Sequence, residues 1–437
     1  MASMSIAYGG VLAFLFRALN AVIAFAIVVL VERASDFGAF GLGITVIGIV
    51  TASTGGMTAS VAYQIANQGR LAGKTLLSGM VPMSVLSVVA ILAGFIGSAV
   101  LSGDVADAAM PVAVAGSAIM LNSVIAGVFL GRGAFIRYNV ALVAPPFFSL
   151  VVIAVVFFVL NERTANAALA SYAAGQWLAF GAAFVYGRRQ LTSSMAFEPR
   201  LSLAMVAFAL SGALSSVVSF LGYRGDQFVV AGFEGKEGVG VYLLAVVVAE
   251  SVWQVSGSLS LATYSRIGAA TREEAVELTA RVMRHTIFLL VIACGLLFLA
   301  ADLIAMFVFS NHAMATPLRL LMPGVLVYSL ASSLSGFYTY QRGLPWVAAL
   351  IAAVALGTNI GLALLLVPAM GVKGAALAKS LGYTFAIASG LVAFMRQEHV
   401  SPARLLRISR SDLEDYRALL QRIRSLLRPS QQAAQLR

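Results

Sequence analysis

The sequence predicts an all-α, polytopic membrane protein, with about twelve transmembrane helices arranged as two parallel six-helix repeats. Composition is the first observation behind this prediction: 60% of the 437 residues are hydrophobic, 11% are charged, and the mean hydropathy is +0.93. Such values are typical of a membrane protein and exclude an ordinary soluble domain. The other two observations are a series of membrane-length apolar stretches and an internal repeat.

Twelve apolar stretches are long enough to cross a bilayer. A hydrocarbon layer of roughly 30 Å needs about 20 helical residues, because each residue rises about 1.5 Å. In chain order, the expected spans are 6–31, 39–65, 76–101, 109–131, 139–160, 167–187, 208–232, 238–262, 285–309, 316–340, 345–367 and 372–395.

The chain repeats itself after about 200 to 210 residues. Arg132 lies in the string GVFLGRG and Arg342 in GFYTYQRG, an offset of 342 − 132 = 210. Each string leads through an apolar span to a small-residue segment, centred on Ala168 and Ala376, an offset of 376 − 168 = 208. This agreement in order and spacing indicates two copies of one structural unit.

A second pair of segments supports the repeat. Gly38 matches Gly240 (240 − 38 = 202), and Tyr63 matches Tyr264 (264 − 63 = 201). Each copy holds six spans, an even number, so both copies enter the membrane from the same side and are related by an axis along the membrane normal. Folds of this kind place a substrate site between the copies, which predicts a transporter.

Basic residues gather in alternate connecting segments. One set of segments carries Arg70, Lys74, Arg132, Arg137, Arg188, Arg189, Arg200, Arg266, Arg272, Arg281, Arg284 and Arg342. The opposite set holds Arg33, Arg163, Lys236 and Lys373 among seven acidic residues: Glu32, Asp36, Asp104, Asp107, Glu162, Glu234 and Glu237. The positive-inside rule places both termini in the cytoplasm. The net charge of +11 then indicates contact with anionic inner-leaflet lipid, and no nucleic acid is expected as a partner.

Several classes of chemistry lack the residues they need. Met1–Gly10 has no basic region typical of a cleavable signal peptide, so we expect the first span to stay in place. Cys294 is the only cysteine and the three histidines are scattered, which argues against a disulfide, a metal site or another cofactor. The chain has no phosphate-binding Gly-rich motif for ATP. The connecting segments are short, and the acidic pair in the outward ones, Asp104 and Asp107, is typical of a solvated helix connection. We therefore expect no catalytic residues and no enzyme.

Charged residues inside the spans carry the main functional signal, because an ionised side chain at mid-bilayer costs from about 3 to more than 10 kcal/mol. Arg17 lies about eleven residues, or roughly 17 Å of helix rise, into the first span. Asn20 lies one turn further on the same helix face. Both side chains are therefore expected near the membrane midplane.

The second repeat contributes four more charged side chains. Arg224 and Asp226 fall in the seventh span, Glu250 about halfway along the eighth, and Lys379 about two turns into the twelfth. Because Arg224 and Asp226 are two residues apart, they point to different faces of one helix. Each therefore needs a partner elsewhere.

Two interpretations of these charges remain open. In the first, a water-filled cavity between the lobes binds an anionic substrate group through Arg17, Asn20, Arg224 and Lys379, while Asp226 or Glu250 balances charge or binds a coupling cation. In the second, the charges are structural: Arg224 pairs with Glu250 across neighbouring helices, or a side chain reaches the interface.

After the twelfth span the chain becomes polar and basic. Apolar residues recur there at helical spacing at Leu413, Tyr416, Leu420, Ile423 and Leu427, between a capping box of Ser411 and Glu414 and a proline at 429. This pattern predicts an amphipathic helix on the cytoplasmic membrane surface. We therefore divide the chain into an N-terminal lobe (1–190), a cytoplasmic linker (191–202), a C-terminal lobe (203–397) and a basic tail (398–437).

Several short motifs in this order resemble one known family. They are Arg17-x-x-Asn20, Asp36-Phe-Gly-Ala-Phe40, Ala59 to Tyr63, Arg224-Gly-Asp226 followed by Val239-Gly-Val-Tyr242, and Gly371-Val-Lys-Gly-Ala-Ala376. Together they resemble the polysaccharide-exporter branch, with its O-antigen-type flippases, of the multidrug/oligosaccharidyl-lipid/polysaccharide superfamily, which includes the MATE transporters. The resemblance covers about residues 5 to 396.

The resemblance implies a fold, a function and partners. It implies two six-helix lobes that form a V and alternate between inward-open and outward-open states in the bacterial inner membrane. The implied substrate is an undecaprenyl-diphosphate-linked oligosaccharide, moved to the periplasmic leaflet for lipopolysaccharide or exopolysaccharide synthesis. A polysaccharide polymerase and a chain-length regulator are further implied partners.

Two rival functions remain. A cation-coupled multidrug antiporter of the same fold needs acidic residues in its cavity, whereas the first six spans contain no carboxylate and do contain Arg17. A non-transporting membrane scaffold, whose tail recruits a biosynthetic complex, needs no charge in a cavity at all.

Overall fold

The protein is helical throughout the part that is described. The computed structural model describes residues 6–34, 36–191, 194–344 and 346–406, and these residues contain no strand. The first half contains α1 (Ile6–Val31), α2 (Phe37–Ala66), α3 (Ala72–Val100), α4 (Asp104–Gly131), α5 (Phe135–Phe158) and α6 (Ala165–Leu191). The second half contains α7 (Pro199–Arg224), α8 (Asp226–Glu250), α9 (Trp253–Ala269), α10 (Arg272–Leu303), α11 (Ala315–Tyr328), α12 (Ala331–Gly336), α13 (Trp346–Met370), α14 (Val372–Glu398) and α15 (Pro402–Leu406). Short π-helical turns at Ile304–Val308 and Phe337–Gln341, and a 3₁₀ turn at His312–Met314, extend three of these helices.

The membrane spans agree with the predicted fold class. Ten described helices are long and apolar enough to cross a bilayer, and Leu15–Val31 forms a shorter apolar helix. One of the ten is a run of 42 residues, Ser216–Gly257, and its backbone turns sharply at Gly235 (φ 66°, ψ −167°). This run is long enough for two spans, one on each side of Gly235, so together with Leu15–Val31 the helices agree with the prediction of about twelve spans.

Tight turns recur in the two halves. Residues with positive φ stand at Gly103 and Ser310 (310 − 103 = 207), and at Asn161 and Gly371 (371 − 161 = 210). Gly133 and Gly343 also share φ of 66°, each directly after one of the matched arginines. The repeat read from the residue strings therefore extends to the backbone conformation of the loops.

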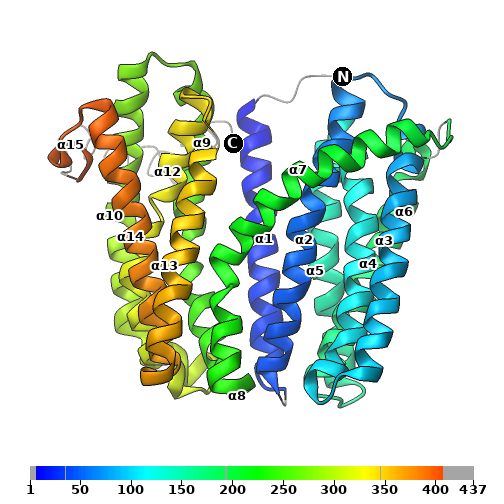
Figure 1. Ribbon diagram of the computed structural model, residues 1–437, viewed down its shortest axis with the longest axis horizontal. Coiled ribbons are helices and arrows are strands. Elements are labelled where there is room, and N and C mark those ends of the chain that lie inside the picture. Colours follow the sequence, from blue (N-terminus) through cyan, green and yellow to red (C-terminus); the bar gives the residue numbers. More distant parts are fainter. Residues whose placement is uncertain (1–5, 35, 192–193, 345, 407–437) are drawn as a thin grey trace, which may run out of the picture.

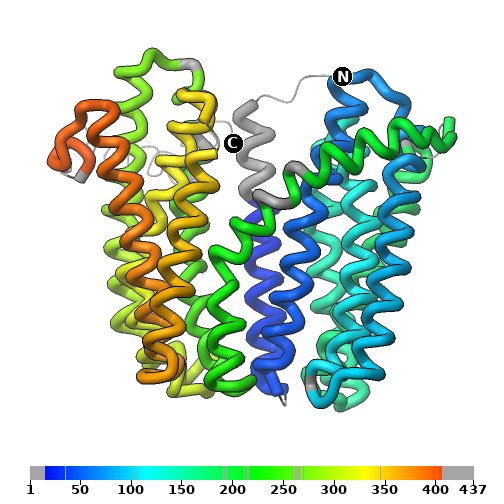
Figure 2. Tube along the Cα trace, viewed as in Figure 1, coloured from blue at the N-terminus to red at the C-terminus, as the bar shows by residue number. Residues whose placement is uncertain are grey.

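The helices form two lobes that meet at one end of the molecule and separate toward the other (Figures 1 and 2). The separated end is the one at which α15 and the α9–α10 connection lie. It is also the end that carries the basic connecting segments. Helix α7 crosses diagonally from the first lobe to the second.

At the closed end, backbones of the two lobes touch. An ideal Cβ built on Gly38 of α2 would lie 1.6 Å from the carbonyl oxygen of Lys236 and 3.1 Å from the amide nitrogen of Gly240, so only glycine fits. The ammonium of Lys236 also forms an ion pair of 2.5 Å with Asp36. We call these four residues the interlobe contact.

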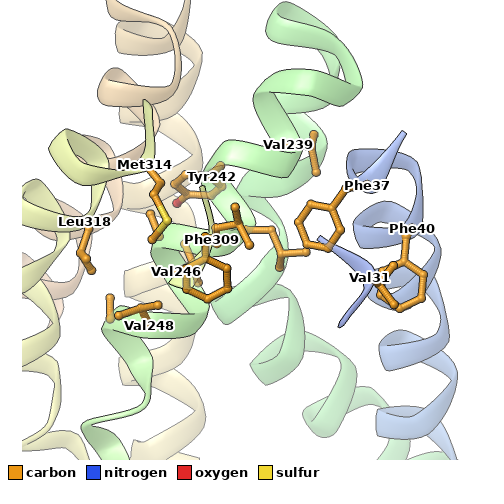
Figure 3. Close-up of a cluster of buried hydrophobic side chains, with 14 of the residues drawn as sticks. Val31, Phe37, Phe40, Val239, Tyr242, Val246, Val248, Phe309, Met314 and Leu318 are labelled. Carbon is orange, nitrogen blue, oxygen red and sulfur yellow. The ribbon is translucent and has the colours of Figure 1, made fainter. Parts of the chain in front are cut away.

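An apolar cluster lies beneath the interlobe contact. Figure 3 shows Val31, Phe37 and Phe40 of the first lobe close to Val239 of the second. All four side chains are buried, Val31 and Val239 completely. Within a bilayer such contacts are stabilised by close van der Waals packing rather than by removal of surface from water, and this packing supports closure of this end.

The first half of α7 is anchored to the first lobe. Ser60 of α2 donates a hydrogen bond of 3.1 Å to the carbonyl of Met205, and an added Cβ at Gly56 would lie 2.3 Å from the carbonyl oxygen of Ala209. Just before α7, the ammonium of Lys74 donates a 2.8 Å hydrogen bond to Glu198 and lowers the pKa of that carboxyl. The second half of α7 packs in the second lobe, where Gly222 lies against the carbonyl of Ala352.

Helix α15 folds back on the second lobe. Leu405 is buried, and the guanidinium of Arg284 donates a 2.7 Å hydrogen bond to the carbonyl of Arg404. Arg404 in turn pairs with Glu277 of α10 at 2.9 Å. The amphipathic helix predicted from Ser411 onward lies outside the described residues.

Candidate functional site

A central cavity of about 870 Å³ lies between the two lobes. Its wall is formed by α1, α2, α5 and α6 of the first lobe and by α7, α8 and the start of α9 of the second. Four of the six predicted site residues line it: Arg17, Asn20, Arg224 and Glu250. They come from both lobes, as a site between two repeats requires.

Arg17 and Asn20 bring polar groups from α1 to the cavity. Both side chains are exposed, and they lie on one face of the helix because they are three residues apart. Among the described residues, no carboxylate lies within 4 Å of the Arg17 guanidinium. Arg17 therefore has hydrogen-bond donors available at the cavity wall.

Arg224 reaches the same cavity from the second lobe but has a carboxylate partner. Its Nη1 lies 2.7 Å from Oε2 of Glu250, and the two side chains are 23% and 9% exposed. The structure thus shows the Arg224–Glu250 pair considered in the second interpretation of the sequence. It also shows Arg224 at the cavity wall, so the two interpretations coexist for this residue.

Lys379 lies behind the wall and does not reach the cavity in this conformation. Its side chain is completely buried, and its ammonium lies 3.1 Å from Oε1 of Glu250 and 3.3 Å from Oδ2 of Asp226. It also donates a 2.7 Å hydrogen bond to the carbonyl of Tyr223. Direct contact with a substrate, expected from the sequence, is therefore closed to Lys379 here, because its donors are used within the lobe.

Asp226 is equally buried and faces away from the cavity. Its Oδ2 accepts hydrogen bonds from the hydroxyl of Tyr242 at 2.5 Å and from the amide of Asn359 at 3.2 Å. Its Oδ1 has no hydrogen-bond partner among the described residues. An unsatisfied buried acceptor is costly, and the ammonium of Lys379, 3.3 Å from Oδ2, is the charge that compensates this carboxylate.

The four charges form one chain through the second lobe. Arg224 contacts Glu250, Glu250 contacts Lys379, and Lys379 contacts Asp226. Two cations and two anions cancel, which is how a protein can hold charges away from water. Glu250 stands at the junction, since its two oxygens bind different cations.

The cavity wall itself has an excess of positive charge. Arg17, Arg224 and Glu250 are its Arg, Lys, Asp and Glu residues within the described part of the chain, which gives 2 − 1 = +1. Apolar residues from both lobes make up most of the remaining wall. Such a surface suits an anionic group attached to an apolar molecule.

Several polar residues of the site were not singled out from the sequence. Asn139 and Tyr172 line the cavity from the first lobe. Tyr242, which follows the kink of α8 at Gly235, and Asn359 of α13 bind Asp226. Asn139 and Asn359 are amides in otherwise apolar spans, and that is a signal that could have found them. Across the lobes, the hydroxyl of Thr45 also donates a hydrogen bond to the side chain of Gln227.

Within the described ranges, no three His, Cys, Asp or Glu side chains lie close enough together to hold a metal ion. Cys294 is buried in α10. The groups that do line the cavity, two guanidiniums, a carboxylate, amides and hydroxyls among apolar side chains, offer charge, hydrogen bonds and apolar contact.

The chain matches no protein-family model and no curated protein sequence. Its fold, however, matches solved structures. A multidrug resistance MATE family transporter of the MOP superfamily in an inward-facing conformation has a TM-score of 0.72 at 14% identity, over 87% of this chain and 94% of that one. The lipid II flippase MurJ in an inward closed conformation has a TM-score of 0.74 at 14% identity, over 88% of this chain and 87% of that one.

A third solved structure has a similar fold but a different suggested function. A MOP superfamily transporter from Pyrococcus furiosus, described as having a binding pocket of reverse polarity that suggests a different function, has a TM-score of 0.62 at 15% identity, over 90% of this chain and 95% of that one. At such identities the likeness shows the fold alone. The chain is thus a multi-pass membrane protein with the fold of MOP-superfamily transporters and flippases.

The comparisons also bear on conformation. An outward-facing structure of a multidrug resistance MATE family transporter matches with a TM-score of 0.63, lower than the 0.72 of the inward-facing one. This difference agrees with lobes that are joined at the interlobe contact and separated at the end with the basic segments.

Proposed function

We propose that this chain flips an undecaprenyl-diphosphate-linked oligosaccharide from the cytoplasmic to the periplasmic leaflet of a bacterial inner membrane. One observation carries the proposal: a net positive cavity between the two lobes, in which Arg17 has no carboxylate partner among the described residues. The MOP-superfamily transporter fold supports it, because relatives in fold include a lipid II flippase.

The chemistry of a lipid diphosphate fits this wall. A guanidinium offers donors in a planar fork that binds two phosphate oxygens at once. Arg17 offers such a fork from α1 and Arg224 from α7, with the Asn20 amide beside Arg17. We propose that these three side chains bind the diphosphate, while the polyprenyl tail stays in lipid.

Glu250 gives Arg224 a way to change partners. When Arg224 turns to a phosphate, Glu250 still has Lys379 at 3.1 Å, so its charge is not left alone in a buried place. Lys379 thus acts through Glu250 and Asp226, as a positioning residue. We propose that Asp226 or Glu250 takes up the coupling cation, since each has one oxygen, Oδ1 and Oε1, without a hydrogen-bond partner among the described residues.

Orientation follows from charge. The lobes separate toward the end with the basic connecting segments, which we propose is cytoplasmic, together with both termini. The basic tail then meets anionic lipid of the inner leaflet. A polysaccharide polymerase and a chain-length regulator would receive the product on the other side.

The proposal is tested by replacing Arg17 with alanine. We expect the rate of flipping to fall by about 10- to 100-fold, because a hydrogen bond to a charged group is worth roughly 1.5–3 kcal/mol. The measurement is the chemical quenching of a fluorescent undecaprenyl diphosphate lipid in proteoliposomes, with Arg17→Lys expected to keep part of the activity.

Arg33→Ala is the matched control, because Arg33 is an exposed arginine on the opposite side of the same lobe and does not line the cavity. If a variant with both Arg17→Ala and Arg224→Ala flips the lipid at an unchanged rate, the two arginines do not bind the anionic group. Deletion that causes drug sensitivity without loss of surface polysaccharide would instead support the multidrug antiporter, and normal flipping without the protein would support the scaffold.

A further inference from the structure

The second lobe contains a second cavity, of about 960 Å³, next to the central one. Ala52, Phe220 and Trp253 belong to the walls of both cavities, so the two adjoin. The ring of Phe220 bridges the lobes, since an added Cβ on Gly48 of α2 would lie 2.2 Å from it. We call this second cavity the side chamber.

The wall of the side chamber differs in chemistry from that of the central cavity. It includes no Asp, Glu, Lys, Arg or His among the described residues, but it has six serines. Its aromatic residues with a polar group are Tyr223, Trp253, Tyr328 and Trp346. Such a wall suits a neutral ligand with both hydroxyl groups and apolar faces.

Three of these serines keep their hydroxyls for a ligand. Serines in helices commonly donate to a backbone carbonyl of the preceding turn, as Ser256 does to Trp253 at 3.1 Å. Ser216, Ser219 and Ser335 make no such bond to any described residue. Ser216 and Ser219 share one face of α7, and Ser335 belongs to α12.

The aromatic rings are held in place. The indole nitrogen of Trp253 donates a 3.1 Å hydrogen bond to the carbonyl of Val325, and its ring lies 5.5 Å from that of Tyr328 and 5.8 Å from that of Tyr223. Trp346, at the start of α13, is 59% exposed. Rigid rings bind a ligand with little loss of side-chain entropy.

We infer that the side chamber binds the neutral sugar portion of the substrate while the arginines of the central cavity hold its diphosphate. Hydroxyls that both donate and accept match the hydroxyls of a sugar, and ring faces cover its C–H groups. The volume is at the upper end of the about 300–1,000 Å³ of small-molecule sites, which leaves room for more than one sugar. This inference rests on the proposed function and adds where the oligosaccharide lies and what recognises it.

The test compares two lipids on the purified full-length protein. The probes are undecaprenyl diphosphate and the same lipid carrying a neutral disaccharide of N-acetylglucosamine, and the Kd of each is measured by thermophoresis. In the unmodified protein we expect the disaccharide to lower Kd by about tenfold, since several neutral hydrogen bonds contribute. In Ser219→Ala/Ser335→Ala this gain should shrink to less than about threefold, with the bare lipid as internal reference.

Ser389→Ala is the control, because Ser389 is an exposed serine of α14 in the same lobe, outside both cavities. It should keep the full gain. Binding of the bare lipid with no gain from the disaccharide, or an equal gain in the double variant, would overturn the side chamber as a sugar site and leave the diphosphate site standing. If neither lipid binds and Arg17→Ala leaves the rate of flipping unchanged, the proposed function itself is overturned.

Discussion

Gly38→Ala is expected to shift the protein out of the state in which the interlobe contact is closed and to reduce transport by about tenfold or more, equivalent to a shift of ~1.4 kcal/mol or more in the equilibrium between the closed and the open contact. The physical reason is steric. A Cβ on Gly38 would lie 1.6 Å from the carbonyl oxygen of Lys236, a distance at which backbone atoms of the two lobes must move apart. The interlobe contact would then no longer close.

The shift can be measured as a distance between spin labels at the closed end. Labels at Asp107 of the first lobe and Glu237 of the second, in a Cys294→Ser background, should move apart in Gly38→Ala. Gly55→Ala is the matched control on α2, because a Cβ there meets nothing within 4 Å. Equal label distances in both variants, with a folded protein in each, would contradict the steric role of Gly38.

Lys379→Ala is expected to destabilise the folded protein strongly. Removing one partner of a buried ion pair costs about 3–5 kcal/mol, because the remaining charge keeps its burial and loses its compensation. Here two carboxylates lose the same ammonium, since Lys379 lies 3.1 Å from Glu250 and 3.3 Å from Asp226. The thermal unfolding midpoint of the detergent-purified protein should therefore fall well below that of the parent.

Two further variants separate charge from packing. Lys373→Ala removes an exposed lysine from the same helix and should leave the midpoint nearly unchanged. Lys379→Met combined with Asp226→Asn removes one charge of each sign, leaves Arg224 with Glu250, and should recover most of the lost stability. No recovery in the double variant would show that Lys379 acts through its shape and hydrogen bond rather than through its charge.

The fold could be predicted from the sequence because the bilayer makes strong demands on it. A spanning helix needs about 20 apolar residues, and basic segments gather on one side of the membrane, so both features can be read from the order of residues. The matched strings around Arg132 and Arg342 add the internal repeat. The break between the seventh and eighth spans was expected between residues 232 and 238, and the turn at Gly235 lies there, but the path of α7 was not predicted. α7 begins at Pro199, earlier than the expected 208, because it continues out of the bilayer along the first lobe.

The candidate site was predictable in part for a physical reason. An intramembrane charge can be found from residue type alone, and the spacing of Arg224 and Asp226 already separates their directions. The rotation of a helix about its own axis cannot be found in this way, so the sequence did not show that Lys379 points into the lobe while Arg17 points into the cavity. Two partners of Asp226, Asn359 and Lys379, lie on helices far along the chain and could not be identified from the sequence.

The course of α7 has a consequence for how the two lobes move. One end of this helix is held by Ser60 of the first lobe and the other lies against Ala352 of the second, with Arg224 at its far end. The lobes are therefore joined by a helix that packs against both of them. A change in the angle between the lobes must bend α7 or break its contacts with one lobe. In either case the Arg224 guanidinium at the cavity wall moves with the lobes, so the anion binding proposed for it would depend on the angle between the lobes.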